Sequence, residues 1–283
     1  MDKLNKLLSK YNIDGYIIPK NDEYFNEYTD NSKDRLKFIS NFSGSAGFAV
    51  ILKNKKYIFV DGRYTIQAKR QTHKNFRVIT IPDKFPKDIL KFKKKIILGF
   101  DPKLHTERQV HSMFKFKNII LKPINCNLVD KVWLNKPKER IKKFFFLPDK
   151  ISGKSVNKKI LELKKYLIKS KYDLLFVSAP ENVSWILNIR GNDNLFSPVT
   201  NARLLIDKKG RLDLFTNPKK TSGITKVLGK KISLHGENKI DEFISKISNK
   251  KILLDNQSCS IHYKNIFEKK NRILLQMVPT YKL

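Results

Sequence analysis

Apolar residues along the chain follow two spacings, one typical of helices and one typical of strands. A stripe with three- and four-residue intervals opens the chain and predicts an amphipathic helix with Leu4, Leu7, Leu8 and Tyr11 on one face. Short continuous apolar runs, such as the one in DGYIIP (14–19), are typical of buried strands. Because helical and strand segments alternate along the chain, the pattern predicts an α/β fold.

The same order of elements occurs twice, each time as a helix, a strand, a short helical segment and a hairpin. The predicted hairpins are FAVIL-KNKK-YIFVD (48–61) and ARLLI-DKKG-RLDLFT (202–216). Between strand and hairpin, four residues of each copy correspond at a constant offset of 147: Phe38, Ile39, Asn41 and Gly44, and Trp185, Ile186, Asn188 and Gly191. Each copy closes with a strand, a helix and a strand, beginning at KKIILGFDPKLHTERQVHSMF (94–114) and KKILLDNQSCSIHYKNIF (250–267). Repeats of this length indicate two duplicated domains, each a mixed β-sheet covered by helices.

The length of the chain and the positions of its prolines indicate the expected domain limits. With 283 residues, of which 40% are apolar, the chain can bury the cores of two medium domains. Pro137 and Pro148 interrupt the periodicity between the two copies. We predict a first domain at 1–125, a connection at 126–155 and a second domain at 156–283.

The formal net charge of +33 invites interpretation as a nucleic-acid or membrane-surface protein. Its 59 basic residues comprise 49 lysines and only ten arginines, however, and arginine is the residue suited to bidentate contacts with bases and phosphates. The lysines spread over all predicted elements, with the densest runs at KFKKK (91–95) and FKFK (114–117). Because no RNP, zinc-finger or helix-turn-helix signature accompanies them, nucleic-acid binding is the least favoured function.

Membrane, secretion and disulfide signals are missing from the sequence. The longest apolar runs fall far short of the roughly 20 residues that span a bilayer, and the N-terminus lacks the apolar core of a signal peptide. Cys126 and Cys259 are too few for a disulfide framework and lack the CxxC spacing of zinc or redox sites. We expect a cytoplasmic protein with two free thiols.

Motifs that carry catalysis are also missing. The sequence contains no HExxH, no GxSxG, no P-loop and no GxGxxG after a strand. Its five histidines are scattered, at 73, 105, 111, 235 and 262, and we expect them to be exposed or half-buried rather than metal ligands. We therefore predict no catalytic residue and no metal ligand in this chain.

Two segments around the first hairpin carry polar or small residues. Asp61 ends a predicted strand and is expected to cap the helix that follows, whereas Arg63 is either a surface charge or a basic group offered to a carboxylate or a neighbouring subunit. GSAG (44–47) is small enough to cradle an anion, but phosphate loops lead into a helix and this one leads into a strand. We expect its glycines to allow close packing of a turn.

Three blocks of the sequence resemble a known family. LKFISNFSGSAGFAVILKNKKYIFVDGRYTIQAKRQ, NLVDKVW ahead of a Lys-Pro, and APENVSWILNIRGNDNLFSPVTNARLLI are similar, in this order, to the N-terminal part of the three-domain Xaa-Pro aminopeptidases (aminopeptidase P) of the creatinase/prolidase superfamily. The resemblance covers essentially the whole chain. It implies two creatinase-type N-terminal domains and accounts for the duplication.

The resemblance implies an enzyme that removes an N-terminal residue preceding proline. In this family a dinuclear centre of divalent metal, with manganese the expected ion, lies in a third, pita-bread domain. The ligands of that centre, two aspartates, a histidine and two glutamates, match no position here, so the catalytic domain is expected to be absent and this chain inactive alone. The resemblance also implies a homodimer, an Xaa-Pro peptide substrate and a catalytic domain as partner, in cis or in trans.

In the family the N-terminal domains support the dimer and help to wall the substrate cleft. The matching candidates in this chain are Ser43 and Ser45 of the SGSAG turn, Asp61, Arg63 and Tyr64 of the corner after the hairpin, and Asn188 and Arg190. Asn188 could equally serve a local backbone cap, and Trp185 packing, as their echoes Asn41 and Phe38 suggest.

Two functions from other classes stay open. A stand-alone module would use the duplicated domain to bind a peptide or a protein partner without cleaving it. A basic nucleic-acid-binding protein would lose its affinity steeply as salt rises.

Overall fold

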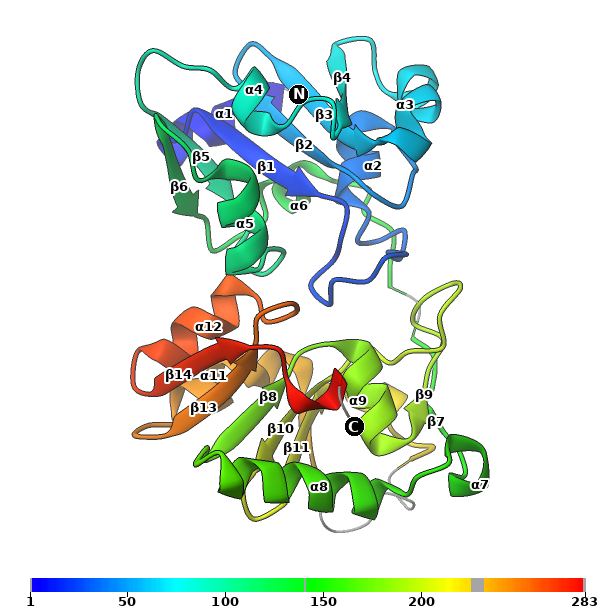
Figure 1. The fold of residues 1–283 in the computed structure, drawn as a ribbon. Coiled ribbons are helices and arrows are strands. Elements are labelled where there is room, and N and C mark those ends of the chain that lie inside the picture. Colours follow the sequence, from blue (N-terminus) through cyan, green and yellow to red (C-terminus); the bar gives the residue numbers. More distant parts are fainter. Residues whose placement is uncertain (1, 140, 225–231, 282–283) are drawn as a thin grey trace. The chain divides into compact units, whose positions relative to one another are not determined.

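The computed structural model describes residues 2–139, 141–224 and 232–281, and the chain divides into two compact units (Figure 1). The first unit contains residues 1–23 and 27–139, and the second contains residues 24–26 and 140–283. The stretch predicted as a connection, 126–155, is therefore shared between the units.

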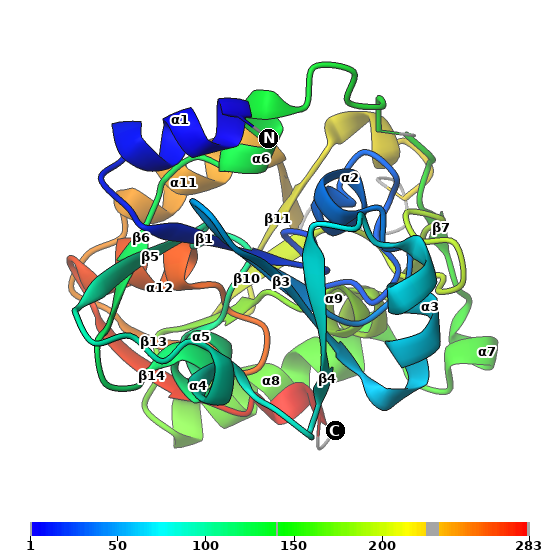
Figure 2. The same ribbon diagram turned by 90° about the horizontal axis from the view of Figure 1, so that it is seen from above.

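The first unit is a mixed sheet with helices packed against it. Its elements are α1 (Asp2–Lys10), β1 (Gly15–Pro19), α2 (Arg35–Ser40), β2 (Phe48–Leu52), β3 (Lys56–Asp61), η1 (Gly62–Tyr64), α3 (Thr65–Gln71), β4 (Phe76–Ile81), α4 (Pro86–Ile89), β5 (Ile96–Phe100), α5 (Glu107–Phe114), β6 (Ile119–Pro123) and α6 (Leu128–Val132). The strand order is β4-β3-β2-β1-β5-β6, with β2 antiparallel to β1 and β3 and the other neighbours parallel. The helix α3 lies beside the edge strand β4 (Figure 2).

The second unit repeats this arrangement. Its elements are β7 (Phe145–Phe146), α7 (Asp149–Ser152), α8 (Val156–Lys169), β8 (Leu174–Val177), α9 (Pro180–Leu187), β9 (Ile189–Arg190), β10 (Arg203–Asp207), β11 (Leu212–Thr216), η2 (Pro218–Lys220), β12 (Ile232–Gly236), η4 (Glu237–Lys239), α11 (Ile240–Ser245), β13 (Lys251–Asp255), α12 (Ile261–Glu268), β14 (Arg272–Gln276) and η5 (Pro279–Tyr281). The order β12-β11-β10-β8-β13-β14 has the same strand directions as the first sheet. The predicted α/β fold with two duplicated mixed sheets is confirmed.

Alternating side chains bury both faces of the second sheet. Along β8, Leu175 and Val177 join the core beneath α8 and α9, whereas Phe176 joins the core beneath α11 and α12. This alternation is the two-residue period of a strand. In the first unit the predicted stripe of α1 also packs inward, with Leu4 and Leu8 fully buried.

Hydrogen bonds fix how the closing strands of the two copies correspond. The carboxylates of Asp14 and Asp173, just before β1 and β8, accept the backbone N–H groups of Ile97 and Lys251. Ile97 therefore corresponds to Lys251, whereas matching the KK letters of the two segments would pair Lys95 with Lys251. Lys95 and Lys251 are both exposed, so they do not determine how the strands align. The register is set by the buried strand pairs and by the hydrogen bonds of Asp14 and Asp173.

His105 contradicts the expectation of exposed or half-buried histidines. It is only 4% exposed, its ring packs edge-on against Phe100, and its Nδ1 lies 2.9 Å from the carbonyl oxygen of Asp101. The residue immediately precedes Thr106, which caps α5, and the side chain at that position commonly packs toward the first turns of the helix. Burial lowers the pKa of His105 to about 4, so its imidazole is neutral at pH 7.

Candidate functional site

The corner after β3 is built around the Asp61 carboxylate. It accepts the backbone N–H of Arg63 at 3.0 Å, which confirms the predicted cap, and it also accepts the Arg63 guanidinium at 2.7 and 3.1 Å. These hydrogen bonds lower the pKa of Asp61. The Arg63 side chain remains 70% exposed, with its guanidinium 5.3 Å from the centre of the Tyr64 ring. Arg63 is thus an oriented surface charge.

The SGSAG turn lies against this corner. The Ser45 hydroxyl is 2.8 Å from the Tyr64 hydroxyl, and Ser43 accepts from the Gln67 amide at 3.1 Å. A Cβ at Gly44 would fall 2.2 Å from the Phe42 ring, which explains why the turn needs a glycine here. The structure therefore brings Ser45, Arg63 and Tyr64 together at one partly exposed surface of the first unit.

Asn188 lies in the second unit and acts as a buried junction, which here means that its side chain joins three other residues by hydrogen bonds. It ends α9 in the left-handed conformation with φ of 49°, and it is 1% exposed. Its amide donates to the Lys154 carbonyl at 2.9 Å and to Asp149 at 3.1 Å, while its side-chain oxygen accepts from Lys159. The backbone N–H of Asn188 caps α9 by donating to the Ser184 and Trp185 carbonyls, as the backbone-cap alternative expects.

Cations surround the carboxyl end of α9. Arg190 donates to the carbonyls of Ser184 and Ile189 at 3.0 and 2.9 Å, and Lys159 donates to the Trp185 carbonyl at 2.6 Å. These bonds satisfy carbonyls at a helix end, where positive charge is favourable. Burial, followed by the nearby charge of Arg190, lowers the pKa of Lys159 to about 8.

Sequence reasoning missed a buried ion-pair network in the first unit. The Arg35 guanidinium is 3% exposed and binds Asp130 at 2.8 and 2.9 Å and Glu23 at 2.6 Å. Burial alone would raise the pKa of Glu23, but the charges of Lys33 and Arg35 outweigh it and hold that pKa well below its usual value. Arg35 and Asp130 are 95 residues apart, so no local pattern could have linked them.

A second missed cluster lies in the second unit around Arg203. Its guanidinium is 4.1 Å from the centre of the Tyr24 ring and 4.8 Å from that of Tyr263. Two residues after Tyr24, the Asn26 amide donates to the side-chain oxygen of Asn201 at 2.9 Å. Residues 24–26 thereby belong to the second unit although they precede α2 in the chain.

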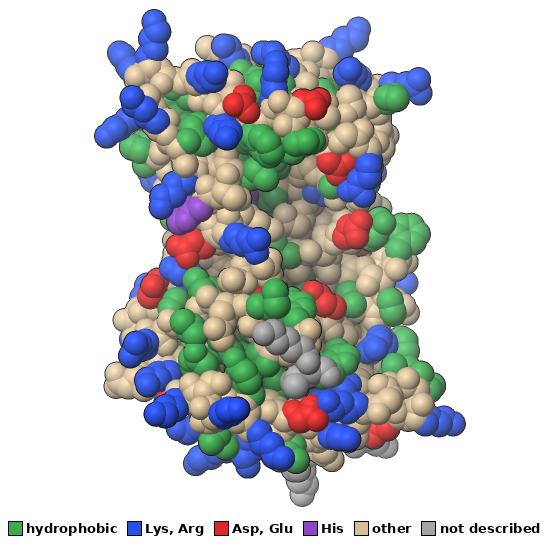
Figure 3. All heavy atoms as spheres, in the orientation of Figure 1, with side chains coloured by type: hydrophobic (Ala, Val, Ile, Leu, Met, Phe, Trp, Pro, Cys, Tyr) green, Lys and Arg blue, Asp and Glu red, His purple; other side chains and the backbone are tan. Residues whose placement is uncertain are grey.

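A metal site, a reactive thiol and a membrane span each require particular groups among the described residues. Within the described ranges no group of three or more His, Cys, Asp or Glu side chains is placed to hold a metal ion. Burial raises the pKa of the Cys259 thiol to about 12, which leaves it unreactive at neutral pH. In the same ranges, none of the helices combines the length and the apolar character needed to cross a membrane. Basic side chains are scattered over the visible face and do not form one stripe (Figure 3).

Comparison with known proteins accounts for the duplicated fold. Residues 1–130 and residues 135–283 each match the Creatinase/Prolidase N-terminal domain. Xaa-Pro aminopeptidase 1 of Dictyostelium discoideum is 32% identical over 302 residues, an alignment that covers 97% of this chain and 48% of that protein. The chain belongs to the creatinase/prolidase N-terminal domain family. It carries two copies of this domain.

Other proteins resemble the chain in sequence or in fold. A probable Xaa-Pro aminopeptidase P of Laccaria bicolor is 34% identical over 206 residues, covering 70% of this chain and 32% of that protein. Among solved structures, an X-prolyl aminopeptidase from Caenorhabditis elegans, described as a cytosolic enzyme with a di-nuclear active site, superposes with a TM-score of 0.88 at 23% identity. That match covers 99% of this chain and 50% of the worm enzyme. The chain thus spans about half the length of the Dictyostelium and worm proteins.

Proposed function

We propose that this chain serves as the non-catalytic N-terminal part of an Xaa-Pro aminopeptidase, which removes an N-terminal residue preceding proline. The observation that carries the proposal is the identity of 32% with the Dictyostelium enzyme along 97% of this chain but only 48% of that enzyme. Hydrolysis would then take place in a further domain, with a dinuclear divalent-metal centre and manganese as the expected ion. That domain would be supplied in the same polypeptide or by another one, in the cytoplasm.

The two domains would support a homodimer and wall the substrate cleft. Ser43, Ser45 and Tyr64 offer hydroxyl groups, and Arg63 offers a charge that Asp61 already orients. Such groups suit hydrogen bonding to the backbone or terminal charge of a peptide. We propose that this corner contacts substrate or the partner protomer.

The second-unit candidates would act indirectly. The Asn188 amide is occupied by Lys154 and Asp149, and the Arg190 guanidinium by two carbonyls of its own unit. We propose that Asn188 and Arg190 position the end of α9 and do not touch the peptide.

The test is an assay of the 283-residue chain on an Xaa-Pro peptide with and without Mn²⁺. We expect no release of the N-terminal residue by the chain alone. We expect release when the chain is combined with the catalytic domain encoded after the Leu283 codon or in a neighbouring reading frame. Metal-dependent cleavage by the chain alone would overturn the proposal, and peptide binding without any such domain in the genome would favour the stand-alone module.

A further inference from the structure

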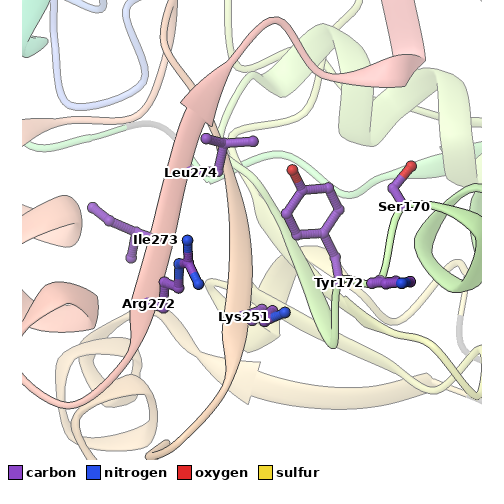
Figure 4. Close-up of a pocket in the computed structure, with 7 residues that line it drawn as sticks. Ser170, Tyr172, Lys251, Arg272, Ile273 and Leu274 are labelled. Carbon is purple, nitrogen blue, oxygen red and sulfur yellow. The ribbon is translucent and has the colours of Figure 1, made fainter.

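A hollow of about 240 Å³ lies in the second unit at the amino ends of β13 and β14 (Figure 4). It is lined by Ser170, Lys171, Tyr172, Lys251, Arg272, Ile273 and Leu274. Three of these residues are cations and none is acidic. The volume is below the roughly 300–1,000 Å³ of pockets for drug-sized ligands, so the hollow suits a compact group.

Two of the cations are held side by side by the sheet. Lys251 and Arg272 are register partners in the parallel pair β13–β14, so their side chains leave the same face of strands about 4.8 Å apart. Like charges in this position repel each other. Among the described residues, the side chains of Lys171, Lys251 and Arg272 form no ion pair. The nearby Asp173 carboxylate accepts from the Lys208 ammonium at 2.7 Å and from the backbone N–H of Lys251 at 2.9 Å.

The first unit provides an internal comparison, because its closing strands have the same register. Ile97 and Ile120 form the pair that corresponds to Lys251 and Arg272. Asn12 stands where the second unit has Lys171, and both residues have positive φ, 51° and 58°. The fold therefore does not require cations at these three places.

We propose that this pocket binds a phosphate group, either as inorganic phosphate or on a compact phosphorylated molecule. The planar guanidinium of Arg272 matches two oxygens of a phosphate, and the ammonium groups of Lys171 and Lys251 add point charges. A dianion offsets the repulsion between paired cations more fully than a monocarboxylate does.

The test titrates inorganic phosphate and pyrophosphate into the 283-residue chain at constant ionic strength. Calorimetry would measure affinity, and NMR would follow the backbone amides of Lys251 and Arg272. We expect one saturable site, and an affinity at least about ten-fold lower in Lys251→Gln/Arg272→Gln. The control Lys158→Gln/Lys165→Gln removes two exposed charges from α8 and should change the affinity by less than about two-fold.

The outcomes of the titration distinguish the possible ligands of the pocket and test whether the pocket binds phosphate. Tighter binding of pyrophosphate than of phosphate would identify a phosphorylated molecule, and equal binding would identify inorganic phosphate. Absence of saturable binding up to about 10 mM, or equal losses in both double variants, would overturn the proposal in favour of diffuse attraction by the net charge. A third variant, Lys251→Ile/Arg272→Ile, copies the first unit and should fold with undiminished thermal stability while losing phosphate binding. None of these measurements involves peptide cleavage, so the result is independent of the proposed peptidase role.

Discussion

Asn41 and Asn188 end corresponding helices in the same left-handed conformation, with φ of 68° and 49°. This conformation is costly for most residues and is tolerated by asparagine. The two side chains make different hydrogen bonds. The Asn41 amide donates to the Gln71 carbonyl at an exposed site, whereas Asn188 is buried and accepts from Lys159. In the second unit the asparagine at this helix end is a buried junction, whereas the corresponding asparagine of the first unit is exposed.

We expect Asn188→Ala to lower the free energy of unfolding of the second unit by about 2–4 kcal/mol, since it loses both a left-handed asparagine and the acceptor of a buried ammonium. Asn41→Ala, the matched control, should cost the first unit about 1–2 kcal/mol. Urea unfolding followed by fluorescence checks this, because Trp133 and Trp185 lie in different units. The fluorescence of each tryptophan is measured in a protein in which the other tryptophan is replaced by Phe. Equal losses at the two positions would contradict the junction role.

We expect His105 to make the first unit sensitive to acid. Its pKa of about 4 in the folded state is below the unfolded value of 6.5, so the unfolded chain binds more protons between these pH values. This contribution to stability is complete above pH 6.5 and is lost as pH falls toward 4, by roughly 3 kcal/mol in all. His105→Gln should show a flatter dependence of unfolding free energy over pH 4–6.5. An unchanged slope in the variant would contradict the assignment.

Arg35→Leu should destabilise the first unit by about 3–5 kcal/mol, because Glu23 and Asp130 would lose their shared buried cation. Adding Asp130→Asn should recover part of this loss, which a double-mutant cycle would measure. The pKa of Glu23 lies below its usual value in the wild type, so its contribution is present at neutral pH and lost as pH falls below about 4.5. The Arg35 variant should show less of this acid loss.

Arg63→Ala should change the unfolding free energy by less than about 1 kcal/mol, since an exposed ion pair contributes little to stability. If the variant nevertheless raises KM for an Xaa-Pro peptide or weakens the dimer of the complete enzyme, Arg63 is a contact residue. Arg70→Ala provides a matched control, because it removes an exposed arginine of α3 that is outside the candidate corner. Unchanged kinetics and unchanged assembly in Arg63→Ala would remove this residue from the candidate site.

Local sequence patterns were enough to predict much of the fold. The stripe of α1, the two hairpins and the Asp61 cap all depend on residues within a few positions of each other. The correspondence of Asn41 with Asn188 was visible because such a local pattern occurs twice in the sequence. Helical and strand periods, caps and turn residues act over such distances, and they determined the duplicated α/β architecture.

Tertiary structure alone decided which polar groups are buried together. Arg35 meets Asp130 across 95 residues, and Asn26 meets Asn201 across 175. The burial of His105 and the register that places Lys251 beside Arg272 also follow from how strands and caps pack. The physical reason is that ion pairs and buried hydrogen bonds depend on proximity in space, which the folded core sets and which periodicity along the chain does not encode.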